Sequence, residues 1–254
     1  MVVAPGGPGT SARTAVVWEV LAAAIAEAQA APGRDGAPLQ VVDAGGGTGG
    51  FAVPLAEAGC VVTVVDSSPD SLAALSRRAD ERGLAGRVIG VQGDLEDLPS
   101  LVAAASADLV LCHSVLQAVD DAATALRAVA GVLRAGGRLS VLVGNRNAVV
   151  LARALAGRPD EAAHALTDPA GRWGDGDGVP RRWTPDELVA LVHGAGLHVE
   201  QLHGVRVVAD LIPSAALDLE PGVPAALLAL ERTLADRSPF RDLATSLHVL
   251  AVRR

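Results

Sequence analysis

Residues 41–50 have the clearest chemical character in this sequence, because a short apolar run there ends in an acid and then breaks into a glycine cluster. The apolar run is typical of a buried parallel strand, and the glycines predict a tight turn before a helix at 51–59. Glycine has no Cβ and tolerates positive φ, so such a turn lets the backbone approach a ligand closely. The free N–H groups at the start of the next helix favour an anionic group. The stretch therefore predicts a ligand-binding turn.

Two patterns fit the letters of this turn, and they predict different ligands. Gly45, Gly47 and Gly50 satisfy the GxGxxG pattern of dinucleotide-binding turns. Asp43, Gly45, Gly47 and Gly49 satisfy DxGxGxG, which resembles the first motif of S-adenosylmethionine-dependent methyltransferases. An acid at the strand end would repel a pyrophosphate but would hold the positively charged amino acid end of S-adenosylmethionine. The second pattern is therefore favoured, with a nicotinamide cofactor or a plain glycine turn as the alternatives.

A second acid stands at the end of the next predicted strand. Residues 60–65 form a continuous β-branched run, as expected of a strand covered on both faces, and Asp66 follows it. A carboxylate at this place can accept both hydrogen bonds of a ribose diol, in nicotinamide and adenosylmethionine sites alike. The alternative is that Asp66 caps the helix that starts near Pro69, but Ser68 could do that instead.

Three acids follow the third predicted strand, at about 87–92. A carboxylate in this position can accept a hydrogen bond from the exocyclic amine of adenine, while Leu95 packs on the ring. The residue types leave the choice between Asp94 and Asp97 open, and a solvated loop is the alternative for the whole segment.

The fourth predicted strand, 107–113, ends at His113 and lies at the topological switch point of a doubly wound sheet, where ligands bind at the carboxyl edge. We therefore expect His113 to contact a ligand, with a satisfied core histidine as the alternative. Cys60 and Cys112 each lie in a strand-like apolar run, which predicts buried reduced thiols. Because adjacent residues on a strand face opposite ways, His113 and Cys112 do not predict a shared metal site.

These residues sit in an alternating order of strands and helices, which predicts an α/β fold with a doubly wound, mostly parallel seven-stranded sheet and a helical and loop insertion after strand five. The length suits a single domain, 1–254. Within it we expect an N-terminal helical segment at 1–36, a cofactor-binding half at 37–145, an acceptor-side insertion and helix at 146–196, and C-terminal strands and a helix at 197–254.

At the start of the chain, Ser11 is expected to cap a helix at 12–30, with Arg13 in its first turn. A cation is unfavourable for the helix dipole there. Arg13 is either a solvated arginine or a cation that reaches the carboxylate of a ligand's amino acid moiety.

The second half of the chain carries weaker signals. The helix after strand four is expected to run to Leu133 and end at Gly136, and a fifth strand to span 138–143. Thr184-Pro185-Asp186-Glu187 is a capping box that predicts a helix to Gly194 or Gly196. The remaining expected elements are a helix at 145–156, an irregular segment at 158–182, a strand region at 197–210, a helix at 224–235 and a strand at 246–253. Residues 174–178, GDGDG, lack the later carboxylates of a calcium site and predict a mobile surface loop.

The composition limits the possible partners. The net charge is −8 and all 21 basic residues are arginine, a balance that does not indicate nonspecific nucleic-acid binding but allows a local basic patch. The long apolar stretches are interrupted by charge, so no membrane association is expected. Residues 1–11 do not read as a secretory signal, which predicts a cytoplasmic protein.

Taken together, the sequence is similar to the bacterial tRNA 5-carboxymethoxyuridine methyltransferase family of class I methyltransferases along nearly its full length. The stretches behind this resemblance are Arg13 with Trp18, DAGGGTG at 43–49, Asp66, HSVLQ with its following acids at 113–121, LRAGGRLSVLVGNRN at 133–147, GVRV at 204–207 and LERTLADRSPFRDLATSLHV at 230–249. The positions that the resemblance implies for contact with S-adenosylmethionine are Arg13, Gly45, Gly46, Asp66, Leu95, Glu96 and His113. Glu96 thus stands beside Asp94 as a candidate for the adenine contact.

The family's reaction would esterify the carboxylate of a modified wobble uridine in tRNA. Such a carboxylate is ionised at neutral pH and needs no general base, but it needs a cation to orient it. Arg146 and Arg206 are the candidates, with ordinary surface arginines as the alternative. Trp173 and Trp183 could stack on bases or anchor their loop. A small-molecule acceptor, a nicotinamide-dependent oxidoreductase and a non-catalytic adenosylmethionine-binding module are the competing functions.

Overall fold

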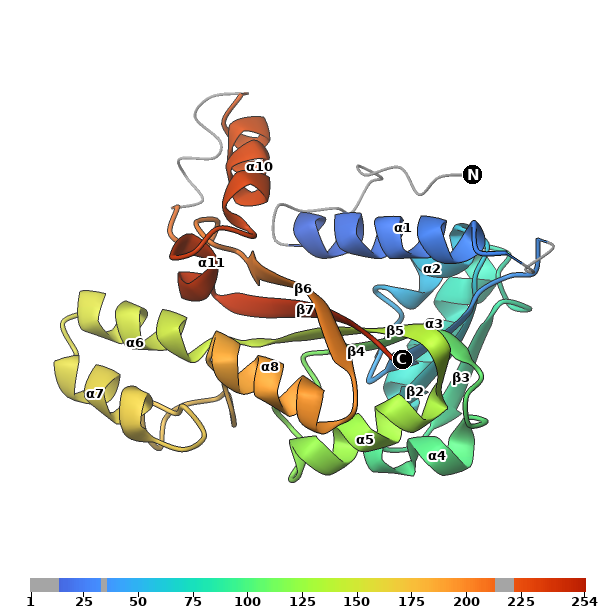
Figure 1. Cartoon of the computed structure of the whole chain (residues 1–254), viewed down its shortest axis with the longest axis horizontal. Helices are drawn as coiled ribbons and strands as arrows, with labels where there is room; N and C mark the ends of the chain where they lie inside the picture. The colour runs from blue at the N-terminus through green and yellow to red at the C-terminus, as the bar shows by residue number, and fades with distance from the viewer. Residues whose placement is uncertain (1–13, 33–35, 213–221) are drawn as a thin grey trace.

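The protein is described by a computed structural model that covers residues 14–32, 36–212 and 222–254. Its centre is a seven-stranded sheet with the strand order β3-β2-β1-β4-β5-β7-β6 (Figure 1). The strands are β1 Gln40–Ala44, β2 Val61–Asp66, β3 Val88–Gln92, β4 Ala107–His113, β5 Leu133–Gly144, β6 His198–Val205 and β7 Ser246–Val252. The predicted α/β fold with a doubly wound, mostly parallel sheet is confirmed, and only β7 runs antiparallel to its neighbours.

The chain starts in the middle of the sheet and builds outward in both directions. β1 pairs in parallel with both β2 and β4, so that Asp43 lies between Val64 and Leu111. The carboxyl ends of β1 and β4 therefore mark the point where the chain changes direction, and ligands bind at such a point in open α/β sheets. Three of the predicted acids and His113 follow or end the strands that meet at this edge.

Helices cover both faces of the sheet (Figure 1). The helices on one face are α1 Ala15–Gln29, α2 Ala52–Glu57 and α3 Pro69–Glu81, and those on the other are α4 Leu98–Leu101, α5 Ala122–Val132 and α8 Pro185–Gly194. Each face has its own buried apolar cluster, which explains why the central strands are apolar throughout. Two predicted helix starts have their expected caps, because the Ser68 side chain accepts from Ser71 N–H and Thr184 forms a capping box with Glu187.

One predicted helix end is wrong by a few residues. The helix before the fifth strand ends at Val132, short of Leu133 and Gly136, because β5 already begins at Leu133, which pairs with Ala107 of β4. The pairing register then shifts: β4 advances by two residues from Ala107 to Leu109, whereas β5 advances from Leu133 to Arg138. The regular part of β5 thus starts where the sequence predicted the strand.

The insertion after β5 is more regular than expected. α6 Arg146–Leu155 confirms the predicted helix, but the segment expected to be irregular contains a further helix, α7 Pro159–Thr167. Its start has a proline in the first turn together with Asp160 and Glu161, both favourable at a helix N-terminus. α6 and α7 form a pair that extends beyond the end of the sheet (Figure 1).

The loop at 174–178 lies mostly at the surface, as the sequence predicts, but one of its carboxylates is buried and holds it in place. Asp177 is buried and forms a two-fold ion pair with Arg182, with Nη1–Oδ2 at 2.6 Å and Nη2–Oδ1 at 2.9 Å. Its carboxylate also accepts from the backbone N–H of Trp173 and Val179. Burial would raise the pKa of Asp177, but the hydrogen bonds from Arg182 and the two amides outweigh it and hold the pKa at about 2. The loop is therefore folded around a buried carboxylate.

The C-terminal part adds α10 Val223–Leu234 and α11 Phe240–Leu243 before β7. Glu231 of α10 is fully buried and accepts hydrogen bonds from the backbone N–H groups of Val207, Val208 and Ala209 at 2.7–2.9 Å. These bonds fix α10 to the segment that follows β6. Among the helices within the described ranges, none is long and apolar enough to cross a lipid bilayer.

Candidate functional site

The glycine turn between β1 and α2 is held by two backbone hydrogen bonds to the neighbouring strand. Gly45 has a φ of +72° and donates its N–H to the carbonyl oxygen of Val65 at 2.7 Å. Gly47 has a φ of +53° and donates its N–H to Oδ2 of Asp66 at 2.8 Å. Both φ values lie in the region that favours glycine. The turn is thus fixed in the shape that the sequence predicted and is joined to the end of β2.

The space around each glycine distinguishes the two sequence patterns. A Cβ on Gly45 would lie 2.2 Å from Cγ2 of Val115, one on Gly46 would lie 2.5 Å from the carboxyl group of Asp43, and one on Gly49 would lie 2.3 Å from Cδ1 of Leu75. A Cβ on Gly50 would meet nothing within 4 Å. The glycines of the DxGxGxG pattern are therefore required by packing or by φ, whereas the last glycine of GxGxxG is not.

Asp43 is 3% exposed at the end of β1, directly beneath this turn. Burial, together with a smaller effect of the negative charge of Asp66, raises the pKa of its carboxyl group to about 7. A buried carboxylate is costly without a positive partner. The site therefore favours a cation next to Asp43, which suits the amino acid end of S-adenosylmethionine and not a pyrophosphate.

Asp66 connects the turn to α3 and keeps part of its side chain at the surface. Its Oδ2 accepts from Gly47 N–H, and its Oδ1 accepts from Ser68 N–H at 2.9 Å. The side chain of Ser68 caps α3, so the alternative in which Asp66 caps this helix is wrong. Each carboxylate oxygen has a second lone pair, so the two amide bonds leave acceptor capacity for a ribose diol.

The acids after β3 surround a short 3-10 helix, Leu95–Asp97. Leu95 is buried in the core, whereas Asp94 and Glu96 are exposed. Asp97 turns back on its own segment, and its Oδ2 accepts from the N–H of Asp94 at 3.3 Å. Asp94 takes part in the same reciprocal capping box, so these local contacts do not separate the two acids that the sequence left open, and Glu96 remains the candidate that the resemblance adds.

His113 ends β4 and lies in a row of ring contacts that the sequence did not predict. Phe51, the residue after the glycine cluster, meets the His113 ring edge-to-face at a centroid distance of 4.6 Å, and Trp18 of α1 stacks on Phe51 at 4.7 Å. Nε2 of His113 lies 2.8 Å from Oγ of Ser140. Burial lowers the pKa of His113 to about 3, so the ring is neutral at physiological pH. The chain has only two phenylalanines and three tryptophans, and this scarcity is the one signal that could have singled out Phe51.

Two non-glycine residues with left-handed backbones lie at the same edge of the sheet. Ser114 follows β4 and Arg206 follows β6, each with a φ of +60°. Such conformations cost on the order of 1–3 kcal/mol and are concentrated at functional sites. The strain supports a functional edge at the carboxyl ends of both strands.

The two arginines proposed to orient an acceptor have different surroundings. Arg146 is buried, with Nη1 3.0 Å from Oε1 of Glu187 and Nη2 donating to the carbonyl oxygen of Pro169 at 3.0 Å. Arg206 is half-buried, donates from Nη2 to Oγ of Ser246 at 2.8 Å and pairs with Asp210 at 3.4 Å. Arg146 is therefore held by the insertion, whereas Arg206 keeps surface at the strand ends. Arg13 lies outside the described residues.

The tryptophans of the insertion also differ. Trp183 is buried, and its backbone bridges Gly144 and Arg146 at the end of β5, so it anchors the loop. Trp173 is partly exposed, and the guanidinium carbon of Arg153 lies 3.8 Å from its ring centroid. Of the two rings, only Trp173 has surface for stacking on a base.

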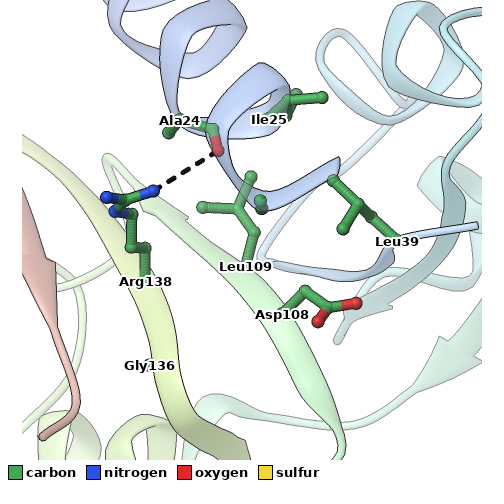
Figure 2. Close-up of a pocket in the computed structure, with 8 residues that line it drawn as sticks. Ala24, Ile25, Leu39, Asp108, Leu109, Gly136 and Arg138 are labelled. Atoms are coloured by element: carbon green, nitrogen blue, oxygen red, sulfur yellow. Dashed lines mark hydrogen bonds between the residues drawn. The ribbon is translucent and has the colours of Figure 1, made fainter. Parts of the chain in front are cut away.

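Figure 2 shows residues that line a small cavity. Its lining includes the first residues of β4, and β4 runs parallel to β1, so the cavity lies at the opposite end of the sheet from the glycine turn. It lies between α1 and the first residues of β4 and β5, and Arg138 spans it to the carbonyl oxygen of Ala24 at 3.4 Å. Its volume of about 10 Å³ is about that of one water molecule. This cavity is too small for a substrate and contains none of the predicted site residues.

Cys60 and Cys112 are buried free thiols, as predicted. Burial raises the pKa of Cys112 to about 12, with a further contribution from Asp43, so this thiol is not reactive. In the described part of the chain, no group of three or more histidine, cysteine, aspartate or glutamate side chains is arranged to hold a metal ion.

Comparisons with known proteins agree with this geometry. Residues 42–141 match the family model described as a methyltransferase domain. The tRNA 5-carboxymethoxyuridine methyltransferase of Escherichia coli O157:H7 is 28% identical over 94% of this chain and 87% of its own length. The ubiquinone biosynthesis O-methyltransferase of Xylella fastidiosa (strain 9a5c) is 32% identical over 66% of this chain and 64% of its own length. Among solved structures, a geranyl diphosphate methyltransferase in complex with S-adenosylmethionine aligns with a TM-score of 0.57 at 18% identity, over 99% of this chain and 94% of that one.

The matched model spans the glycine turn, Asp66, the acids after β3 and His113, which are the residues that the structure gathers at one edge of the sheet. The glycines that packing requires, the buried acid beneath them and the matched family all indicate S-adenosylmethionine as the cofactor. The chain is therefore an S-adenosylmethionine-dependent methyltransferase with the class I fold.

Proposed function

We propose that this methyltransferase methylates the carboxylate of a modified wobble uridine in tRNA. The observation that carries the proposal is the extent of the similarity. The relative with a tRNA nucleoside in its name matches 94% of the chain, including the insertion and the C-terminal strands, whereas the ubiquinone relative matches 66%. The similarity to the tRNA enzyme thus extends well beyond the matched domain at 42–141 into the rest of the chain.

The side chains at the site suit an acceptor that is already ionised. S-Adenosylmethionine supplies an electrophilic methyl group for in-line displacement when it is bound. The histidine at the strand edge is a poor general base, because burial lowers the pKa of His113 to about 3. A carboxylate needs no base, whereas a hydroxyl acceptor does. The neutral histidine therefore supports a carboxylate acceptor over a phenol or an alcohol.

We assign the cofactor contacts to residues of the first four strands. Asp43 would face the cationic amino acid end, Asp66 would accept from the ribose hydroxyls, and Asp94 or Glu96 would meet the adenine amine. Gly45, Gly46 and Gly47 would provide the close backbone surface, and Leu95 and His113 would border it. Arg13 stays a proposal from the resemblance for the carboxylate of the amino acid moiety.

Of the two acceptor-orienting candidates, Arg206 fits better than Arg146. Arg206 keeps about a third of its side chain exposed (30%) and follows β6 at the carboxyl end of the strand, where Ser246 and Asp210 hold its guanidinium group. We expect Arg206→Ala to raise the KM for the acceptor about 10-fold, the scale for loss of a charged hydrogen bond, and to leave S-adenosylhomocysteine affinity unchanged. Arg206→Lys is the matched control, because it keeps the charge but loses the planar fork. A KM that both variants leave unchanged would remove Arg206 from the acceptor site.

The proposal is tested with labelled S-adenosylmethionine and tRNA isolated from cells that carry the carboxylated wobble uridine. We expect label to enter the tRNA fraction, to be lost on nuclease treatment, and to be released by mild alkali, because alkali hydrolyses a methyl ester. Matched tRNA without the carboxylated nucleoside is the control. Label that is insensitive to nuclease and follows a small-molecule fraction would contradict the tRNA assignment.

A small-molecule acceptor is the second candidate function, and the ubiquinone relative supports it. The cofactor half alone would serve either acceptor. Calorimetry with S-adenosylhomocysteine and with NAD tests the oxidoreductase alternative, because an oxidoreductase would bind NAD. The absence of any labelled product in cell extract would favour a non-catalytic adenosylmethionine-binding module. The cytoplasmic location stays a prediction from the sequence.

A further inference from the structure

Four polar side chains, two of them fully buried and two partly buried, form a row across strands β4, β5, β7 and β6, and the cofactor motif does not require this row. The row runs from His113 of β4 through Ser140 of β5 to His248 of β7, with His203 of β6 at its end. Oγ of Ser140 lies 2.8 Å from Nε2 of His113 and 2.8 Å from Nε2 of His248. The His248 and His203 rings are stacked at 5.8 Å.

The middle of this row is sealed from water. Ser140 and His248 are both 0% exposed. The next residue but one on the same face of β7, Leu250, packs with Val20 and Ala24 of α1. Burial lowers the pKa of all three histidines, so the rings are neutral and each carries one N–H. A neutral ring has one donor nitrogen and one acceptor nitrogen, so the serine bonds restrict which tautomers are possible.

The hydroxyl of Ser140 has one hydrogen, so it can donate to only one of its two histidine partners and must accept from the other. In one arrangement Ser140 donates to His113, and His248 donates from Nε2. His113 then carries its proton on Nδ1. In the reverse arrangement His113 donates from Nε2, and His248 must carry its proton on Nδ1.

The surroundings of the two Nδ1 atoms choose between these arrangements. Neither atom has a hydrogen-bond partner, and both are buried. A buried N–H without a partner is rarer than a buried acceptor without one. The Nδ1–H therefore belongs on the ring whose surroundings can partly satisfy an N–H donor. His248 is fully enclosed, whereas His113 is only partly buried and has the ring of Phe51 at 4.6 Å, which can receive a weak N–H contact. The first arrangement is the one with the smaller penalty.

We infer that Ser140 and His248 are positioning residues that hold His113 as its Nδ1–H tautomer and thereby support the cofactor turn. The connection to the turn runs through Phe51, which follows the glycine cluster and is packed between the rings of His113 and Trp18. A His113 ring that is fixed at Nε2 keeps Phe51 in place, and Phe51 in turn fixes the end of the glycine turn. The inference rests on the assignment of the cofactor site and is independent of the methyl acceptor.

The tautomers are measured directly by long-range ¹H–¹⁵N correlation spectra of the full chain labelled with ¹⁵N-histidine. We expect the His113 signals to show a proton on Nδ1 and the His248 signals to show a proton on Nε2. His113→Gln and His248→Gln assign the two signal sets. The opposite pair of tautomers, or an averaged pattern for either ring, would overturn the assignment.

The positioning role is measured as S-adenosylhomocysteine affinity by calorimetry, which needs no acceptor. Ser140→Ala is expected to weaken binding about 5-fold, the scale of one lost hydrogen bond, and to give an averaged His113 tautomer. Ser106→Ala is the matched control, because the hydroxyl group of Ser106 donates to the carbonyl oxygen of Ala103 in an exposed loop. Unchanged affinity in Ser140→Ala would overturn the positioning role even if the tautomers are as expected.

A second pair of variants keeps the test valid if Ser140→Ala is unstable. His248→Gln retains an amide N–H that can donate to Ser140, whereas His248→Phe keeps the ring volume and the stack on His203 but has no donor. We expect His248→Gln to bind S-adenosylhomocysteine more tightly than His248→Phe, with both variants folded by thermal unfolding. Equal affinity of two folded variants would contradict the inference. Failure of the tRNA assay would leave these outcomes unaffected.

Discussion

The two halves of the sheet use carboxylates in different ways. In the cofactor half, β1 to β4 with their helices, Asp66 accepts from two backbone amides and stays partly exposed. In the acceptor half, β5 to β7 with the insertion, Glu231 accepts from three amides and is fully buried. The first carboxylate retains lone pairs for a ligand, and the second has a structural role only. The same side-chain chemistry therefore marks a proposed binding site in one half and an anchor in the other.

The arginines repeat this contrast within the acceptor half. Asp177 binds Arg182 in a buried pair, and Glu187 lies against Arg146, so these cations stabilise the insertion. Arg206 at the end of β6 keeps about a third of its side chain exposed (30%), although it also contacts Ser246 and Asp210. Arg158 and Arg232 are more exposed, at 61% and 43%, so exposure alone does not single out Arg206. Its place directly after β6 is what makes it the proposed contact for the acceptor.

The largest effect should come from removing the anchor of the acceptor half. Glu231→Ala leaves three backbone N–H groups without acceptors, and we expect the free energy of unfolding to fall by about 3 kcal/mol. Denaturant unfolding measures the change, and Glu81→Ala on the exposed end of α3 is the control. A fall in the free energy of unfolding of less than about 0.5 kcal/mol would show that water replaces the carboxylate. Glu231 would then not be a structural anchor, and its role would not contrast with that of Asp66.

A methyl group on the glycine turn tests the cofactor half. Gly46→Ala places a Cβ 2.5 Å from the Asp43 carboxyl group, and overpacking of this kind costs about 1–3 kcal/mol. We expect S-adenosylhomocysteine affinity to fall at least about 10-fold. Gly50→Ala, which meets nothing within 4 Å, should bind like the wild type. Equal losses in both variants would restore the dinucleotide pattern as the better description of the turn.

Asp66→Ala asks whether the exposed part of this carboxylate contacts the cofactor. We expect adenosylmethionine binding to weaken by about 1–3 kcal/mol, the scale for losing charged hydrogen bonds to a hydroxyl pair. Part of the loss reflects the freed amides of Gly47 and Ser68, so Asp66→Asn is measured alongside. Calorimetry on folded protein gives both values, and unchanged affinity in Asp66→Ala would refute the ribose assignment.

The smallest expected effect is a pH dependence that originates at Asp43. The fold raises its pKa from 3.8 to about 7, so folding favours the protonated form. The stability that this group contributes is fully present below pH 4 and is lost as the pH rises through about 7. A cationic ligand favours the ionised form, so S-adenosylhomocysteine affinity should rise between pH 6 and pH 8 by up to about 10-fold.

Asp43→Asn is the control for this pH dependence, because an amide does not titrate. It should bind S-adenosylhomocysteine more weakly and remove most of the rise in affinity between pH 6 and pH 8. The free energy of unfolding of Asp43→Asn minus that of the wild type should also be larger at pH 8 than at pH 5. A pH profile that Asp43→Asn leaves intact would assign the titration to another group.

The sequence by itself determined the order of strands and helices, the glycine turn with its acid, and the caps at Ser68 and Thr184. These features depend on residues that are close in the chain, where periodicity, missing Cβ atoms and capping side chains act directly. The same local signals, Pro159 followed by two acids, are present at the start of α7. The prediction of an irregular segment there was therefore wrong although the sequence carries a helix start.

The tertiary structure decided which charged and polar groups are available to a ligand. The sequence shows Arg146 and Arg206 as equal candidates, and only their contacts with Glu187, Pro169 and Ser246 separate them. Ser140 and His248 meet although they lie 108 residues apart, because β7 inserts beside β5. Contacts over such separations leave no pattern in a single sequence, since their partners come together only when the strands pair. The candidate residues of the cofactor site could therefore be predicted from the sequence, whereas the candidates on the acceptor side could be separated only with the structure.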